Sequence, residues 1–423
     1  MMSLKTKIAR QIILSIALFS LAGQLAWAVE NQYYNVFMYN VITPEPIYVS
    51  IMVALSTIVG TIATIIMGAY SDVRGKRKPL LLYGFIFWSI TTAMFPLSAG
   101  FIRISTEVAI FIAILFDAIM TFFGAMALNA GLNAYITDMT NLDNRGKVTS
   151  IAQMMVMVAL LIVNGTGGLL ITALGYYAFF FIVGGLVLVL GLLGNLKIQE
   201  SIDLTPLEIG TFSHIRKTFR KENLKGYKDF FIVLIVIGTW QIGLNIFYPF
   251  LMIYLQHNIG FSILTASILI FIALLTSIVL AYPLGILTDK VGRKRMTFIA
   301  AVSFGVSLFV FGFFNDITML LILGSIWATF YLGISISTFS WAKDLYPEEN
   351  RGEFSGYWNL FSGTIPMVIG PLIGGWLATE FGIYQLIEGN WGYVPTSLIF
   401  FVSGIVILLT IIPLYFAKEA TID

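Results

Sequence analysis

Long apolar runs alternate with short polar segments along the whole chain. Residues 177–196 and 393–416, for example, each run for about twenty residues without an ionised side chain. At about 1.5 Å of rise per residue, a helix of that length crosses the roughly 30 Å hydrocarbon core of a bilayer. The short alternating segments of a membrane barrel are missing, and backbone amides in lipid must then pair within a helix. The pattern predicts an all-α polytopic membrane protein.

Twelve such runs occur, and we expect each to be a transmembrane helix. An even number of crossings places both ends of the chain on the same side of the membrane. The predicted spans are residues 11–41, 47–71, 79–98, 107–137, 148–174, 177–196, 229–256, 262–287, 296–314, 317–343, 352–378 and 393–416.

The positive charges test this layout, because Lys and Arg accumulate in cytoplasmic loops. With these spans, 23 of the 24 Lys and Arg residues fall on one side, and Arg103 alone falls on the other. We therefore expect a multi-pass cell-membrane protein with both termini in the cytoplasm. The basic start and Ala26-Trp27-Ala28 imitate a cleaved signal peptide, but the helical pattern continues beyond them to about Val41.

The composition agrees with burial in lipid. Of the 423 residues, 58% are hydrophobic and 11% are charged, whereas soluble domains carry about 25% charged residues. The absence of cysteine excludes disulfides and thiolate metal sites. The two histidines, His214 and His257, fall in predicted loops, which excludes a histidine proton relay inside the membrane.

The chain also contains an internal repeat. Gly68-x-x-x-Asp72-x-x-Gly75-Lys76-Arg77-Lys78 follows span 2, and Gly285-x-x-x-Asp289-x-x-Gly292-Arg293-Lys294-Arg295 follows span 8, with an offset of 217 residues. A second pair, Asp138 with Arg145-Gly146 and Asp344 with Arg351-Gly352, follows spans 4 and 10. We expect two six-helix halves, 1–196 and 229–423, joined by a basic cytoplasmic linker, 197–228.

The repeated loop resembles the signature of the major facilitator superfamily (MFS) of transporters, and the resemblance covers the whole chain. It implies the MFS fold, in which two pseudo-symmetric six-helix halves rock around a central site. We expect the loop glycines to permit close helix approach and a tight turn. By resemblance, Arg77 would latch the cytoplasmic side with Asp72 and Asp138 as partners. The full set of expected gating residues is Gly68, Asp72, Gly75, Arg77, Asp138, Arg145, Gly285, Asp289, Gly292, Arg293, Asp344 and Arg351.

Polar side chains are unevenly distributed among the spans. Spans 3, 6, 9 and 12 carry no Asp, Glu, Asn or Gln away from their ends. Polar groups in lipid need a cavity or a partner, and several of them share a helical face with aromatic residues. We take as solute-binding candidates Gln24, Trp27, Asn31, Tyr34, Asn129, Asn133, Gln241, Asn245, Trp327 and Tyr331. Interhelical hydrogen bonds or ordinary packing are the alternative interpretation.

Glu30 and Asp117 are the only carboxyl groups well inside the predicted spans. No Lys or Arg lies well inside any span to pair with them. A carboxyl group surrounded by apolar residues can exchange a proton near neutral pH, and carboxylate with amide oxygens can also hold sodium. We therefore expect Glu30 and Asp117 to be the site of cation coupling.

The lining chemistry favours a small neutral solute. Amides and aromatic faces without an internal cation suit a hydroxyl-rich compound such as a sugar. Residues 24–30 and 135–146 also resemble the glycoside and sucrose type of cation symporter within the superfamily. Drug or metabolite efflux by proton antiport is the alternative, although span 5 has Gly165-Thr166-Gly167-Gly168 without the proline that the antiporter motif needs.

An enzyme or a non-transporting receptor is a third class. No pair of histidines or nucleophile with its base is apparent, no nucleotide-binding loop occurs, and the longest loop has about thirty residues. We expect a monomeric carrier that needs no cofactor and no metal. Its expected partners are the solute, a coupling proton or sodium ion, and the bilayer, with no nucleic acid.

Overall fold

The computed structural model describes residues 10–140, 142–196, 198–200, 206, 210–211, 227–345 and 351–418. Within this part of the chain, eleven helices are long and apolar enough to cross a membrane. One of them, Gly146–Asn195, has 50 residues and would measure about 75 Å if straight, more than twice the hydrocarbon thickness. It belongs to α7 (Leu142–Asn195), which changes direction at Gly175, where φ is 79°. This helix accounts for spans 5 and 6, and the twelve-helix architecture follows.

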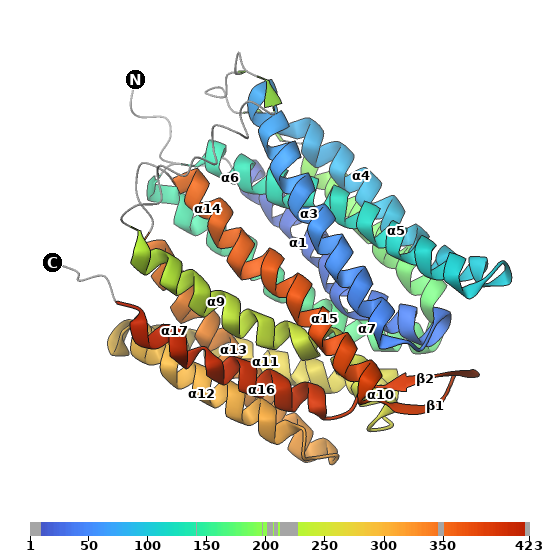
Figure 1. Ribbon diagram of the computed structural model, residues 1–423. Helices are drawn as coiled ribbons and strands as arrows, with labels where there is room; N and C mark the ends of the chain where they lie inside the picture. Colours follow the sequence, from blue (N-terminus) through green and yellow to red (C-terminus); the bar gives the residue numbers. More distant parts are fainter. Residues whose placement is uncertain are drawn as a thin grey trace, which may run out of the picture. The chain divides into compact units, whose positions relative to one another are not determined.

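The chain divides into two compact units (Figure 1). Unit 1 comprises residues 1–42 and 55–218, and unit 2 comprises residues 43–54 and 219–423. Residues 43–54 belong to unit 2 because the first turns of α3 (Pro46–Arg74) pack with that unit, while the rest of this helix packs with unit 1. The two units are described separately below.

Unit 1 consists of helices that pack side by side. The helix α1 packs along α7, and α4 packs along both α7 and α5. Several crossings combine regular and irregular helical turns. The elements are α1 (Arg10–Val29), η1 (Glu30–Tyr34), α2 (Asn35–Phe37), η2 (Met38–Ile42), α3, α4 (Lys78–Met94), η3 (Phe95–Arg103), α5 (Thr106–Gly124), η4 (Ala125–Leu132), α6 (Asn133–Met139) and α7.

Unit 2 repeats this arrangement. The helix α9 packs against α15 and α16, and α13 packs against α11 and α12. The elements are α9 (Lys228–Phe247), η6 (Tyr248–Phe250), α10 (Leu251–His257), α11 (Ile263–Val291), α12 (Arg293–Phe311), α13 (Ile317–Asp344), α14 (Arg351–Asn359), η7 (Leu360–Thr364), α15 (Ile365–Glu380), β1 (Ile383–Ile387), β2 (Asn390–Val394), α16 (Leu398–Leu409) and α17 (Ile411–Phe416).

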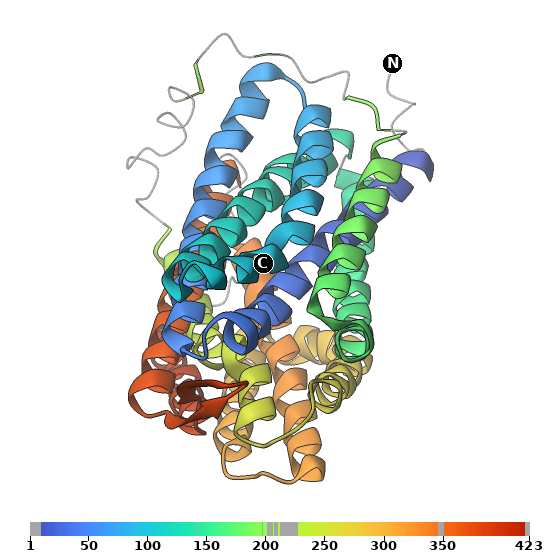
Figure 2. The same ribbon diagram turned by 90° about the vertical axis from the view of Figure 1, so that its right-hand side faces the viewer.

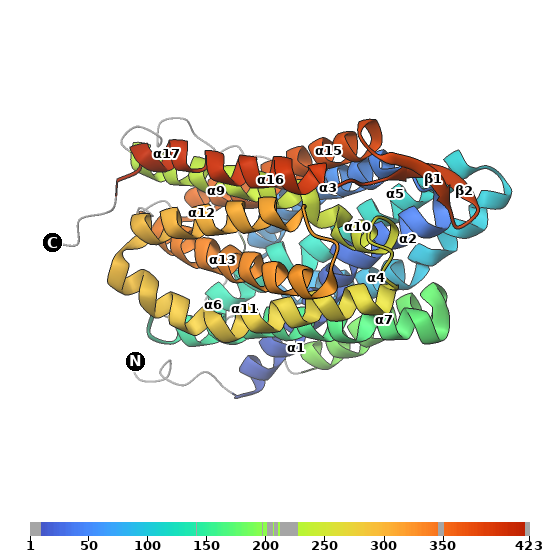
Figure 3. The same cartoon turned by 90° about the horizontal axis from the view of Figure 1, so that it is seen from below.

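The strands β1 and β2 form an antiparallel hairpin that the sequence pattern did not predict. Its two turn residues, Glu388 and Gly389, both have positive φ, as a tight two-residue hairpin turn requires. The hairpin lies beside the ends of α15 and α10 (Figures 2 and 3), and the amide of Tyr393 donates to the carbonyl of Pro44 at 3.0 Å. The predicted span 393–416 was therefore wrong at its start, because the last helix begins at Leu398.

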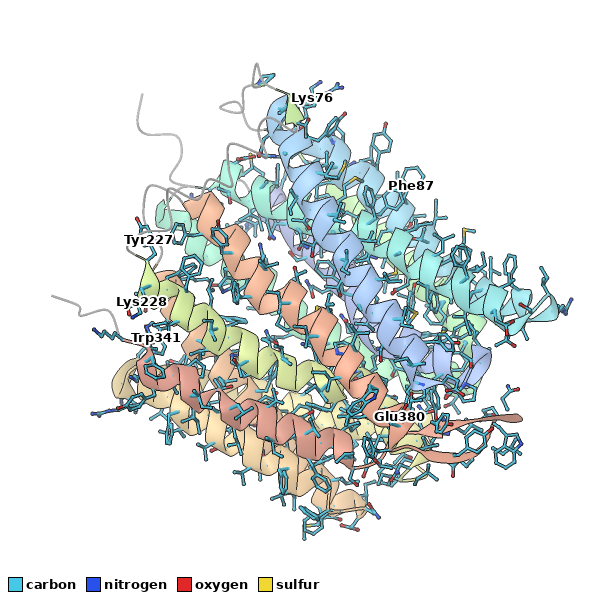
Figure 4. All side chains as sticks on the ribbon, in the orientation of Figure 1. Lys76, Phe87, Tyr227, Lys228, Trp341 and Glu380 are labelled. Atoms are coloured by element: carbon cyan, nitrogen blue, oxygen red, sulfur yellow. The ribbon has the colours of Figure 1, made fainter. Side chains whose placement is uncertain are left out.

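The exterior of both units is apolar. Tyr83, Phe111 and Val279 are examples of large hydrophobic side chains that are more than half exposed on helices. Phe87 likewise points outward from α4 (Figure 4). Charged ends bound the helices: in unit 2, Lys228 and Glu380 lie at opposite ends (Figure 4). Such a surface would be insoluble in water and fits a multi-pass membrane protein.

Glycines allow the helices of unit 2 to approach closely. A Cβ atom added at Gly374 in α15 would lie 2.0 Å from the main-chain oxygen of Ile246 in α9. We expect Gly374→Val to lower the free energy of unfolding by about 1–3 kcal/mol, because a backbone cannot move aside as a flexible side chain does. Thermal unfolding in detergent measures this. Gly185→Ala is the control, since an added Cβ there meets no described atom within 4 Å, and an equal loss of stability in both variants would refute the packing argument.

Candidate functional site

Two carboxyl groups come together inside unit 1. Asp117 lies in α5 and is almost completely buried, and Glu30 begins the π-helical turn η1. The hydroxyl of Thr121, one turn after Asp117, lies 2.7 Å from Glu30 Oε1 and 2.9 Å from the main-chain oxygen of Asp117. Ser56 of α3 donates a hydrogen bond to the Asp117 side chain. Three helices thus bring an acid pair and two hydroxyl groups into one cluster.

The acid pair has no basic partner among the residues that the structure describes. The side-chain ion pairs of that part of the chain are made by Arg77 and Arg293. Oε2 of Glu30 and Oδ1 of Asp117 are buried without a hydrogen-bond partner. Two uncompensated buried charges would cost far more than the hydroxyl groups return. A proton or a metal cation bound here would neutralise this cluster in part.

An irregular backbone positions Glu30. The turn η1 is π-helical, and so is η4 on the neighbouring crossing, which follows α5. A π-helical turn accommodates an extra residue and rotates the following side chains relative to an α-helix. Gln24, Trp27 and Asn31 share the less buried face of this crossing with Glu30, whereas Tyr34, at the end of the π-helical turn, is fully buried.

The solute-binding candidates of unit 1 fall into two groups. Tyr34 is held in the interior, where its hydroxyl donates to the Thr92 carbonyl and its ring stacks on Phe95 at 3.6 Å. The other candidates keep some exposure. Trp27 packs against Trp88, with ring centroids 5.5 Å apart, and the Asn31 side chain donates to the main-chain carbonyl of Trp27. Asn129 and Asn133 are both exposed, one turn apart, and Asn129 reaches Thr64 Oγ1 at 3.3 Å.

The candidates of unit 2 lie on α9 and α13. Gln241 and Asn245 are partly buried, and Asn245 donates to the Gln241 carbonyl at 2.8 Å. Trp327 is buried against Phe247, with its Nε1 lacking a hydrogen-bond partner. Tyr331 is partly buried and lies beside Trp240, with ring centroids 6.0 Å apart.

A second charged cluster surrounds Arg77 at the start of α4. Its Nη2 lies 2.6 Å from Asp72 Oδ1, its Nε lies 2.8 Å from Asp138 Oδ2, and its Nη1 contacts the Ser71 hydroxyl. The Arg77 side chain is only 6% exposed. Burial alone would lower the pKa of Arg77, but Asp138 and Asp72 outweigh this effect and raise it above the ordinary value. The guanidinium therefore stays charged and joins three segments of unit 1.

Unit 2 carries the equivalent cluster in a looser form. Arg293 pairs with Asp289, and its Nε lies 3.4 Å from Asp344 Oδ2. Arg293 is 28% exposed, and Asp289 is 71% exposed. The pairs that the repeat suggested are thus present in both units, with unequal burial.

The structure corrects the expectation for two of the loop glycines. Gly75 and Gly292 have φ values of 62° and 96°, so the turn requires them. Gly68 and Gly285 do not mediate close approach within the part of the chain that the structure describes. An added Cβ at Gly68 would meet Ala130 at an ordinary 3.9 Å, and one at Gly285 would meet no described atom within 4 Å. The side chains of Arg145 and Arg351 lie outside what the structure describes.

Sequence reasoning missed three residues of these clusters. Thr121 and Ser56 are ordinary hydroxyl residues within apolar spans, and only their position beside the acids distinguishes them. Glu200 was assigned to the linker, but its two carboxylate oxygens accept from the backbone amides of Arg77 and Lys78 at 2.9 and 2.7 Å. It therefore caps the first turn of α4. The i+4 spacing of Asp117 and Thr121 was the one available signal.

Repeated bundles of membrane-spanning helices, with matching charged loops and a buried acid cluster, define a polytopic transport protein. The sequence profile described as Major Facilitator Superfamily matches residues 11–251 and 230–422, so the chain belongs to that superfamily of transporters. The superfamily is a group of transporters rather than enzymes.

Curated relatives match parts of the chain. Multidrug resistance protein 2 of Bacillus subtilis (strain 168) is 24% identical over 262 residues, which are 61% of this chain and 62% of that protein. An uncharacterized MFS-type transporter of Methanocaldococcus jannaschii is 28% identical over 156 residues, 37% of this chain and 40% of that one. The chain thus spans less than two thirds of the length of each.

Solved structures match the fold over nearly the whole chain. The nucleoside transporter NupG superposes with a TM-score of 0.74 at 12% identity, covering 96% of this chain and 100% of that one. A bacterial homologue of the human lysosomal transporter Spinster gives 0.73 at 13% identity, covering 96% of each chain. A D-xylose–proton symporter gives 0.70 at 16% identity, covering 98% and 99%. At these identities the likeness establishes the fold alone.

Proposed function

We propose that this MFS transporter is a secondary active carrier that moves a small, neutral, hydroxyl-rich solute together with a proton or a sodium ion. The observation that carries the proposal is the acid pair Glu30–Asp117, buried without a basic partner among the described residues. An acid pair of this kind is useful to a protein that binds and releases a cation in each cycle.

The lining residues support a neutral solute. The amides of Gln24, Asn31, Asn129, Asn133, Gln241 and Asn245, with Trp27, offer hydrogen bonds and one ring face but no cation. The nucleoside transporter and the D-xylose–proton symporter that share this fold agree with this choice of solute. We expect the carrier to act as a monomer in the cell membrane, with both termini in the cytoplasm, as the positive charges indicate.

Efflux of a drug or metabolite by proton exchange is the second candidate. It is favoured by the similarity to the multidrug resistance protein of Bacillus subtilis, which covers 61% of this chain. The same acid pair would serve an exchanger, so the coupling site alone does not distinguish symport from antiport. The direction in which protons move relative to the solute distinguishes them.

Uptake into proteoliposomes tests the proposal. The panel should contain nucleosides, pentoses, hexoses, organic anions and lipophilic cations, each with an imposed pH gradient, a sodium gradient or neither. We expect gradient-stimulated uptake of a nucleoside or a sugar. Gradient-stimulated movement of lipophilic cations, with none of the sugars or nucleosides, would favour the exchanger. If no compound of the panel were transported under any gradient, the proposal would be contradicted.

A further inference from the structure

The hairpin of β1 and β2 has two unlike faces. Successive residues of a strand point to opposite faces, and directly opposed residues of an antiparallel pair point to the same one. The register therefore places on one face, which we call the aromatic face, Tyr384, Leu386, Trp391 and Tyr393. The other face carries Ile383, Gln385, Ile387, Asn390, Gly392 and Val394.

This other face attaches the hairpin to unit 2. A Cβ atom added at Gly392 would collide with Pro44, so the backbone of β2 packs directly on that residue. The Gln385 side chain donates to the main-chain carbonyl of His257, at the end of α10, at 3.3 Å. The strands accordingly lie beside α10 (Figure 3). One face of the hairpin is thus occupied by its own protein, and the aromatic face is left open.

The aromatic face is exposed and internally ordered. Tyr384, Leu386 and Trp391 are 57%, 59% and 60% exposed. The Tyr384 ring stacks on Trp391, with centroids 5.3 Å apart, and lies 5.1 Å from the ring of Tyr393. Water solvates such a continuous apolar surface poorly, and a surface of this kind indicates a contact with another apolar phase.

The lipid-facing surface of α15 leads to this hairpin. The membrane-spanning segment Gly356–Glu380 contains α15, and the next one begins with α16 at Leu398. Trp376 and Phe381 are 52% and 53% exposed where the first of these segments ends, with ring centroids 5.7 Å apart. Since β1 begins two residues after Phe381, the hairpin lies where two consecutive crossings reach the same surface of the membrane.

The residue types suit the headgroup region of a bilayer. Tyr and Trp accumulate at this depth because the ring is apolar while its O–H or N–H group can donate to water or to a headgroup. Water also reaches the strand edges there, whereas the hydrocarbon core would leave their backbone groups unsatisfied. Residues 381–397 contain no Lys or Arg and one acidic residue, Glu388, in the turn. Binding therefore needs no anionic lipid.

We propose that the aromatic face of the hairpin lies on the bilayer, with Tyr384, Leu386 and Trp391 inserted among the headgroups at the ends of α15 and α16. Through its other face, the hairpin then holds Pro44 and the end of α10 at a fixed depth near the membrane surface. This contact goes beyond the proposed function, because it would exist whatever solute the protein carries.

The chain has no cysteine, so an introduced cysteine can be labelled alone with a nitroxide. Leu386→Cys, labelled and reconstituted in phosphatidylcholine vesicles, tests the proposal by electron paramagnetic resonance. Molecular oxygen concentrates in lipid and a neutral nickel chelate in water. We expect oxygen to relax the Leu386→Cys label more than the chelate does, as for Phe111→Cys, a 63% exposed position on α5. Tyr384→Cys serves if Leu386→Cys does not fold.

The matched control is Asn390→Cys, which lies next to the turn, is exposed and belongs to the opposite face of the hairpin. Its label should be relaxed more by the nickel chelate. A Leu386→Cys label as accessible to the chelate as the Asn390→Cys label would place the aromatic face in water, open to a solute or a soluble partner, and overturn the proposal. A label shielded from both reagents, with dipolar broadening that grows with the protein-to-lipid ratio, would overturn it in favour of a second copy of this chain.

Discussion

Glu30→Gln will abolish accumulation of the solute against its gradient while leaving passive exchange intact. A pH difference of one unit is worth about 1.4 kcal/mol per proton, which sustains about tenfold accumulation of a neutral solute when one proton accompanies each molecule. A glutamine cannot release a proton, so the accumulation ratio should fall to about 1, the value without coupling. Proteoliposome uptake with an imposed pH gradient, compared with counterflow at equal pH, measures both quantities.

Asp117→Asn should act in the same way, because the Asp117 carboxyl group lies close enough to Glu30 to act on its charge. The matched control is Glu107→Gln, which removes an exposed carboxylate from the first turn of the same helix, α5. It should accumulate solute as the wild type does. Full accumulation by both Glu30→Gln and Asp117→Asn would show that coupling occurs elsewhere in the protein.

The second large effect is expected at the Arg77 cluster. Asp72→Asn removes one of the two carboxylates that hold a nearly buried guanidinium, while Asp138 remains to keep it neutralised. We expect a folded, inserted protein that transports more slowly, on the order of tenfold, which corresponds to about 1.4 kcal/mol. Initial uptake rates measure the loss, and size-exclusion chromatography verifies folding.

The internal repeat supplies the comparison for this experiment. Asp289→Asn makes the equivalent change in unit 2, where the aspartate is 71% exposed rather than 37% and the arginine is 28% exposed rather than 6%. Solvent weakens exposed ion pairs, so this variant should slow transport less. An Asp72→Asn variant as fast as wild type, or slowed less than Asp289→Asn, would argue against a latch that depends on burial.

The helical spans could be predicted because one physical requirement, the thickness of the hydrocarbon core, sets their length. The break at Gly175 falls between the predicted spans 148–174 and 177–196, where the chain turns back from one crossing to the next. The hairpin was missed because Tyr393 and Val394 are apolar and lie close to a long apolar run. Its strands depend on a two-residue turn and on a hydrogen bond to Pro44, some 350 residues earlier in the chain.

The candidate site could be predicted only in part. Glu30 and Asp117 stand out because ionisable residues are costly in lipid, whatever their neighbours are. The contacts that assemble the two clusters join residues far apart in the sequence and could not be predicted. Thr121 contacts Glu30, 91 positions away, and Glu200 accepts from the backbone amide of Arg77, 123 positions away. The π-helical turn at Glu30 also changes which residues share a face. The prediction assumed a regular 100° rotation per residue and therefore placed Tyr34 among the lining residues, but Tyr34 is buried.

The central claim is that solute movement drives the movement of a proton or a sodium ion through Glu30 and Asp117. The most direct test records the internal pH and the internal sodium concentration of proteoliposomes, with trapped fluorescent dyes and no imposed gradient, when the transported solute is added outside. Symport predicts that the interior gains protons or sodium in wild type and gains neither in Glu30→Gln and Asp117→Asn. An interior that gains neither ion in wild type during demonstrable uptake, or an ion gain that persists in both variants, would contradict the account.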